Sequence, residues 1–209
     1  MFKGIEIRSN KRNISTSGLM GLIGREIELP REEREEQEYV SVCKYLIDYI
    51  VSEKPVIKPD QTISFKSWVL KFIAEDDSKL VMYEADVQTG DYRRGVDHAI
   101  KAAQEQESMC RLHNAAPHFP TLNQKIVISE GVYEGLPLEG VRYPSPAHMS
   151  GWWLSTDLYN GDIKSLLIVH AYHVYAKRKD IVKYLALPFG FRFFYSQEGQ
   201  DVWLDDKIK

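Results

Sequence analysis

Apolar residues recur at helical spacing in the first half of the chain. Separations of three and four residues place six of them on one helix face: Tyr39, Val42, Cys43, Leu46, Ile47 and Ile50. Pro30 suits the first turn of such a helix, and the helix dipole favours the acidic residues that follow it. The pattern predicts a helix over about residues 30–53 that ends before Pro55.

A second amphipathic stretch predicts a helix over about residues 92–112, which ends near Asn114 and before Pro117. Its inward face holds Val96, Ala99, Ile100, Ala103 and Cys110. A third, shorter helix is expected over residues 177–186.

Alternating apolar and polar residues predict strands in the remaining segments. The phase of the alternation slips between Phe65 and Trp68, which indicates a bulge or two sub-segments. Residues 8–24 are polar and glycine-rich, and we expect an irregular arm there. The predicted strands cover residues 2–7, 62–73, 79–87, 125–129, 151–155, 165–175, 190–195 and 201–204.

These elements do not alternate regularly between strand and helix, so the expected class is α+β with mostly antiparallel sheets. A long segment over residues 130–148, rich in glycine and proline, is expected to be an ordered loop that faces another protein. We expect an N-terminal α+β part over residues 1–124 and a C-terminal module over residues 125–209, intimately packed because no flexible linker separates them.

Charge and composition limit the partners. A net charge of −3 and an isoelectric point near 6.1 give no bias towards nucleic acid, so no direct nucleic-acid partner is expected. No apolar run approaches the length of a membrane span, and the N-terminus lacks the features of a secretory signal. We therefore expect a cytoplasmic protein without a membrane partner, in which Cys43 and Cys110 are buried free thiols. The sequence leaves the oligomeric state open.

Two groups of residues are candidates for chemistry. Cys110, His113 and His118, with His98 earlier in the chain, offer zinc ligands without the recurrent spacing of a zinc site, so no metal or cofactor is expected. Glu84 and Asp86 share a strand face and suit acid–base or Mg²⁺ chemistry, although a solvated face of an edge strand is the favoured interpretation.

Other groups are simpler to interpret. His170 and His173 are expected on opposite faces of one strand, which is the wrong geometry for a shared ligand. Lys177-Arg178-Lys179 is expected to be a solvated turn. No catalytic residue is predicted.

The aromatic residues of the C-terminal region carry a different implication. Most of them are expected in a core, and the remainder beside Tyr133 and Tyr143 would form an interface, because tryptophan and tyrosine dominate protein-binding hot spots. The set comprises Trp152, Trp153, Phe189, Phe191, Phe193, Phe194 and Trp203.

A motif pattern in this region resembles a known family. Ser150-Gly151-Trp152, a polar turn with Asp157, an apolar strand, Tyr184-Leu185-x-x-Pro188-x-Gly190 and an acidic final strand resemble the immunity family numbered thirty-three of bacterial polymorphic-toxin systems, over about residues 148–206. The resemblance implies a protein that binds a cognate toxin and blocks it, without an active site of its own.

The leading hypothesis is therefore a cytosolic immunity protein that covers a toxin, for which a nuclease with a basic cleft is one candidate. The expected contact surface is the 130–148 loop with the acidic C-terminal edge: Glu130, Tyr133, Glu134, Glu139, Tyr143, Asp157, Asp201 and Asp205. Two alternatives stay open: a metal-dependent hydrolase that uses Glu84, Asp86, His98 and His113, and a structural protein of a secretion or phage system.

The first hypothesis makes a prediction about its contact surface. The double variant Tyr133→Ala with Glu134→Lys should weaken toxin binding without unfolding the chain, because it removes an aromatic anchor and reverses a charge. Calorimetric titration with the toxin measures the effect, and an unchanged affinity would exclude this surface.

Overall fold

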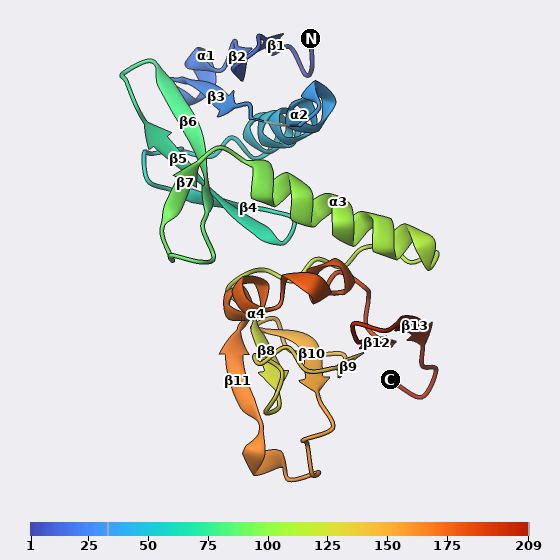
Figure 1. The fold of residues 1–209 in the computed structure, drawn as a ribbon. Helices are drawn as coiled ribbons and strands as arrows, with labels where there is room; N and C mark the ends of the chain where they lie inside the picture. Colours follow the sequence, from blue (N-terminus) through green and yellow to red (C-terminus); the bar gives the residue numbers. More distant parts are fainter. Residues whose placement is uncertain (33, 209) are drawn as a thin grey trace. The chain divides into compact units, whose positions relative to one another are not determined.

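The protein consists of two compact units. The computed structural model describes residues 1–32 and 34–208, and its units span Met1–Lys101 and Ala102–Lys209 (Figure 1). Each unit holds a mixed, mostly antiparallel sheet, and the described residues form three helices of seven residues or more. The predicted α+β class is confirmed. A division of domains at residue 124 stays a prediction.

The N-terminal unit is built on a seven-stranded sheet with the order β1-β2-β3-β6-β5-β4, and β7 pairs with β6. The β3–β6 pair is parallel and the other pairs are antiparallel. The strands are β1 (Glu6–Ser9), β2 (Asn13–Ser17), β3 (Glu26–Pro30), β4 (Thr62–Phe65), β5 (Trp68–Ala74), β6 (Lys79–Ala85) and β7 (Tyr92–Arg94).

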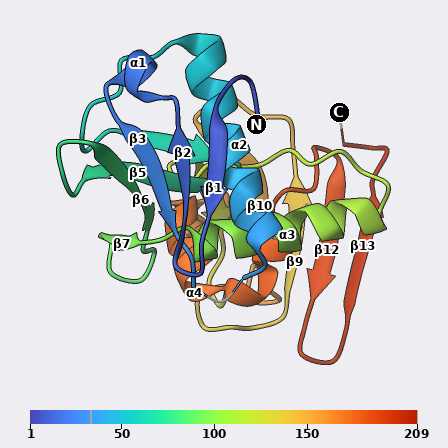
Figure 2. The ribbon, with the colours of Figure 1, turned by 90° about the horizontal axis from the view of Figure 1, so that it is seen from above.

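Helix α2 (Glu36–Glu53) packs on β1 and β2, and Figure 2 shows it beside these strands. All six residues of its predicted apolar stripe are fully buried. The helix begins later than predicted, because Ile27 and Leu29 are buried in a strand that ends at Pro30. Glu35 and Glu38 then form a capping box. Residue 33 lies outside the described residues.

One expectation for this unit is confirmed and two need correction. Residues 62–73 form two sub-segments, as one of the two predicted alternatives has it: β4 and β5 are paired strands joined at Lys66, whose φ of 54° allows a tight turn. The arm over residues 8–24 is instead a β1–β2 hairpin followed by α1 (Met20–Ile23). The helix predicted from residue 92 begins at Asp97 as α3 (Asp97–Leu112), because β7 pairs with β6 first. The chain passes into the second unit within α3.

The C-terminal unit is built on a six-stranded sheet with the order β11-β8-β10-β9-β12-β13 (Figure 1). The β8–β10 pair is parallel and the other pairs are antiparallel. The strands are β8 (Lys125–Ile128), β9 (Leu138–Arg142), β10 (Met149–Ser155), β11 (Leu167–His170), β12 (Phe191–Tyr195) and β13 (Gln200–Leu204). Figure 2 shows β12 and β13 as a long hairpin.

Two C-terminal expectations were wrong in part. The 130–148 segment is not all loop, because it contains β9, whose Leu138 and Arg142 are buried. The strand predicted over residues 165–175 ends at His170, and Ala171–Lys177 forms α4 because Ala171, Val174 and Tyr175 are buried at helical spacing. His170 and His173 therefore lie on different elements. The two short 3-10 turns are η1 (Ile163–Ser165) and η2 (Lys179–Tyr184).

One fully buried cation organises the core of this unit. The Arg142 guanidinium donates hydrogen bonds to the carbonyls of Ser150, Leu185 and Leu187 at 2.9, 3.1 and 2.5 Å, and to that of His118 at 2.7 Å. It also lies over the Trp152 ring, 5.6 Å from the centroid. Burial lowers the pKa of Arg142 to about 10, so the side chain stays charged at neutral pH.

The motif residues of the C-terminal region surround this cation. The Trp152 indole N–H donates to the Leu185 carbonyl at 2.8 Å, which also accepts from Arg142. Gly151 has a φ of 86°, and a Cβ there would lie 2.2 Å from the Tyr143 carbonyl oxygen. The Gly190 N–H donates to the Arg142 carbonyl at 2.8 Å. The Gly-Trp and Leu-x-x-Pro-x-Gly elements are therefore parts of one framework.

This arrangement predicts the effect of removing the cation. Arg142→Leu leaves several buried carbonyls without a donor, and each such group costs about 1–3 kcal/mol. We expect the free energy of unfolding of the C-terminal unit to fall by about 3 kcal/mol or more, measured by urea denaturation with tryptophan fluorescence. Arg111→Leu, at an exposed position of α3, is the control and should change little. Equal effects of the two variants would contradict this role of Arg142.

Candidate protein-binding surface

The two faces of the C-terminal sheet differ in what covers them. Side chains of Trp152, Leu154 and Phe193 point into the core, where the Phe193 ring lies 4.4 Å from that of Tyr184 and nearly parallel to it. Because strand side chains alternate, their neighbours point to the opposite side. We call that opposite side the outer face.

The strand registers place one continuous row of side chains across the outer face. Its members are opposite one another in successive strands, so they share a side of the sheet. In spatial order the row runs Ile168, Val127, Trp153, Val141, Arg192 and Trp203. The next row includes Glu139, Phe194 and Asp201. The outer face is therefore aromatic and apolar along its middle.

Several large aromatic side chains on this face are exposed. Trp153 is 38% exposed, and Tyr143 and Phe194 are each 41% exposed. The rings of Tyr143 and Trp153 meet edge to face with centroids 6.1 Å apart. Together with Pro144, Pro146 and Met149 they line an open hollow of about 440 Å³. Rigid, partly exposed aromatic groups beside a hollow are typical of a protein-binding surface.

A charged cluster borders these aromatics. Arg192 donates to Glu139 at 2.7 Å and to Asp205 at 2.8 Å, and its guanidinium lies 5.5 Å from the centre of the Trp203 ring. The hydrogen bond from Arg192 lowers the pKa of Asp205, and its two carboxylate partners raise the pKa of Arg192. Two of the acids predicted to bind a toxin, Glu139 and Asp205, are thus already paired with Arg192, and these hydrogen bonds fix the position of its side chain.

The segment over residues 130–137 forms a second, separate part of the surface. The Arg178 guanidinium is buried, donates to the Val132 and Leu136 carbonyls at 2.8 and 3.3 Å, and pairs with Asp180. The expectation of a solvated basic turn was therefore wrong for Arg178. Because both carbonyls belong to the 130–137 segment, Arg178 fixes its conformation.

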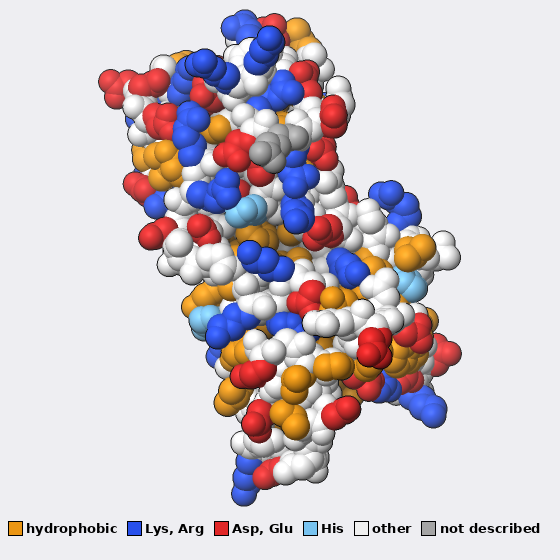
Figure 3. Space-filling view, viewed as in Figure 1, with side chains coloured by type: hydrophobic (Ala, Val, Ile, Leu, Met, Phe, Trp, Pro, Cys, Tyr) orange, Lys and Arg blue, Asp and Glu red, His pale blue; other side chains and the backbone are white. Residues whose placement is uncertain are grey.

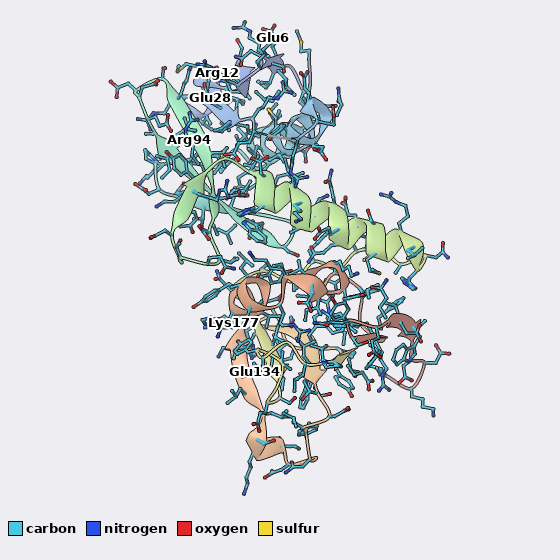
Figure 4. The ribbon with its side chains drawn as sticks, in the orientation of Figure 1. Glu6, Arg12, Glu28, Arg94, Glu134 and Lys177 are labelled. Atoms are coloured by element: carbon cyan, nitrogen blue, oxygen red, sulfur yellow. The ribbon has the colours of Figure 1, made fainter. Side chains whose placement is uncertain are left out.

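Tyr133 is less available than the sequence suggested. Its ring is half-buried under the Lys177 ammonium, 4.8 Å from the ring centroid. Within the part of the chain that the structure describes, its hydroxyl is buried without a hydrogen-bond partner, and burial raises its pKa to about 12. Glu134 is exposed, and Figure 4 shows it on the same side of the unit as Lys177. Tyr133 therefore offers less exposed area for contact than the sequence predicted, and its role in binding stays a prediction.

The structure divides the other six predicted contact residues into two groups. Glu139, Tyr143, Asp201 and Asp205 lie on or beside the outer face. Glu130 and Asp157 lie near each other, because the Thr156 hydroxyl donates to the Glu130 carbonyl at 2.6 Å, and both are exposed.

The sequence did not single out Trp153, Phe194 and Arg192 as one surface. Strict alternation beside the buried Trp152 and Phe193 was the signal that could have identified the two aromatic residues.

The candidate catalytic pair in the N-terminal unit has a structural role. Glu84 is fully buried in the central strand β6, so the expectation of a solvated edge strand was wrong. Its carboxylate accepts the backbone N–H groups of His98 and Ala99 at 3.1 and 2.8 Å, at the first turn of α3. Asp86 instead accepts the Gln88 N–H in an exposed turn. Glu84 thus satisfies donors that a helix start leaves unpaired.

The candidate metal ligands are not gathered into a site. Among residues 1–32 and 34–208, no group of three or more His, Cys, Asp or Glu side chains is placed to hold a metal ion. Cys43 and Cys110 are buried free cysteines, as predicted, and burial raises the pKa of their thiols to about 12 and about 11.

Comparison with known proteins defines the class of the C-terminal half. Residues 105–205 match a model for a family of immunity proteins. The family is the Imm33-like domain, so the C-terminal half of this chain is an Imm33-like domain. The resemblance stated for residues 148–206 is confirmed, and the match begins earlier, within α3. No curated protein and no solved structure matches the chain. None of the described helices has the length and apolar character to cross a membrane.

The buried carboxylate makes a prediction about pH. Burial raises the pKa of Glu84 from 4.5 to about 7, against the opposing effect of its two N–H donors and Arg93. The protonated form therefore stabilises the fold fully below pH 4.5, and this contribution is lost as the pH rises through 7. Carboxyl ¹³C chemical shifts, assigned with Glu84→Gln, should titrate with a midpoint near 7, and a midpoint near 4.5 would contradict the burial argument.

Proposed function

We propose that this protein is an immunity protein that binds a cognate bacterial toxin and occludes it without turnover. The observation that carries the proposal is the Imm33-like domain over residues 105–205. The outer face gives this proposal a physical basis, because it offers exposed aromatic groups on a rigid sheet. Binding to a preformed face avoids the entropy cost of ordering a loop.

The anchors of the proposed interface are Tyr143, Trp153 and Phe194. Their rings can bury apolar area against a toxin, and the hollow beside Trp153 can receive one of its side chains. The Arg192 cluster with Glu139 and Asp205 forms the polar rim at one side. Affinity would then come mainly from the aromatic centre of the outer face.

Charge would supply specificity and rate of association. Acidic and basic residues are nearly balanced over residues 102–209, so the unit as a whole does not attract a basic partner. Glu130, Glu134 and Asp157 are locally exposed acids, and they would meet basic groups on the toxin. A nuclease that acts in the cytosol remains the toxin class that we propose, because its cleft must be basic to bind nucleic acid.

The proposal is tested first by growth rescue. Co-expression of this protein with the toxin encoded beside its gene should restore growth, and the purified pair should form a complex in size-exclusion chromatography. Failure of both rescue and complex formation with that toxin would reject the assignment of this partner.

A second test addresses the surface. Trp153→Ala and Tyr143→Ala should each weaken toxin binding at least about tenfold, because truncation of a hot-spot aromatic costs about 2 kcal/mol or more. Tyr92→Ala, at a tyrosine that is 36% exposed in the other unit, is the matched control and should leave affinity unchanged. Calorimetric titration gives the affinities. Full affinity in both outer-face variants would exclude this face, whatever the outcome of the growth test.

A further inference from the structure

The C-terminal sheet has an apolar open edge at β11. Within the described residues β8 is its only strand neighbour. Leu167 and Ile168 are 57% and 63% exposed, and no charged residue lies between Ser165 and Tyr172. Figure 3 shows hydrophobic side chains along the margin where β11 lies in Figure 1. Edge strands usually carry charge or proline to prevent pairing with another chain, and β11 has neither.

The hydrogen bonds of the sheet show which backbone groups of β11 face outward. The Ala171 N–H donates to the Gln124 carbonyl at 2.7 Å, so Leu167 and Val169 also bond towards β8. The N–H and C=O groups of Ile168 therefore point away from β8, as does the His170 N–H.

The groups at either end of this edge complete the pattern. The Leu166 N–H donates to the Ile163 carbonyl at 3.2 Å, which leaves its outward C=O available. The His170 carbonyl belongs to the N-cap of α4 and accepts a bond of that helix. In chain order the open edge offers an acceptor at Leu166, a donor and an acceptor at Ile168, and a donor at His170.

This order is complementary to itself under a two-fold axis. We propose that β11 pairs antiparallel with β11 of a second copy of this chain, with the axis at Ile168. Each Ile168 N–H then donates to the Ile168 carbonyl of the other copy, and each His170 N–H donates to the Leu166 carbonyl of the other copy. Every outward group finds a partner, and the pairing requires neither the Leu166 N–H nor the His170 carbonyl.

The side chains at the axis favour the same arrangement. Two Ile168 side chains meet directly across the axis, and β-branched pairs stabilise antiparallel strands. No like charges oppose each other, because the strand carries none. The two sheets become continuous, and the outer face of each copy keeps its Trp153 and Tyr143 region away from the axis. This inference is independent of the toxin proposal, since it concerns the protein alone.

Sedimentation velocity tests the pairing on the full chain without toxin. The wild type should form dimers that dissociate on dilution from submillimolar to micromolar concentration. Ile168→Lys and Ile168→Pro should be monomeric with unchanged circular dichroism. The control Ile163→Lys lies outside the strand at a residue that is 70% exposed, and it should still dimerise. A wild type that is monomeric at every concentration would overturn the inference.

A covalent test covers the case in which an edge variant misfolds. Opposed residues of a hydrogen-bonded antiparallel pair lie about 5.5 Å apart at Cα, within reach of a disulfide. Ile168→Cys should therefore oxidise to a covalent dimer much faster than Ile163→Cys, although residue 163 is more exposed. The native cysteines are buried and should not interfere. Equal oxidation rates of the two variants would contradict the axis. If the wild type is monomeric and Ile168→Lys loses toxin binding, the β11 edge contacts the toxin and the proposed pairing is wrong.

Discussion

The C-terminal unit depends on the buried charge of Arg142, for which the residues that the structure describes supply no oppositely charged partner. Arg142 makes its hydrogen bonds to carbonyl groups from three separate parts of the chain, around His118, Ser150 and Leu185. A guanidinium has donors in a fixed planar fork, so it holds these segments in one geometry. The desolvation of such a cation is costly, and it is tolerated only because several carbonyl dipoles surround it.

The alternation of side chains in β10 connects this framework to the proposed function. Trp152 points inward and fixes the core, while its neighbour Trp153 points outward and offers an anchor. The motif that identifies the family therefore describes the support of the sheet. The residues that would meet a toxin lie on the other side of the same strands, where the framework constrains their position.

The sequence predicted the parts of the fold that depend on local periodicity. The buried stripe of α2 and most of the C-terminal strands were predicted, because alternation and helical spacing are visible in the residues themselves. The start of α2, the short β7 and the helix at Ala171 were missed, since each is decided by pairing or burial against distant residues. Glu84 was predicted on a solvated face for the same reason, because the N–H groups that it accepts, at the start of α3, are far from it in the sequence.

The candidate surface was predicted only in part. Loop residues such as Glu134 and Tyr143 were identified from composition, and both are exposed. The outer face itself depends on the register of six strands, which no short pattern reveals. Arg192 was not chosen because its importance comes from the pairing of β12 with β9 and β13, which brings Glu139 and Asp205 to it.

The hydrogen bonds of the two arginines of this sheet, Arg142 and Arg192, respond differently to acidification. Arg142 bonds to neutral carbonyls, so acidification removes none of its acceptors. Arg192 donates its hydrogen bonds to carboxylates, which lose their charge when they are protonated. Because the pKa of Asp205 is lowered, its carboxylate stays charged to a lower pH than that of an ordinary aspartate. As the pH falls, the contact of Arg192 with Asp205 at the rim of the sheet would therefore be lost before the contacts of Arg142 in its interior.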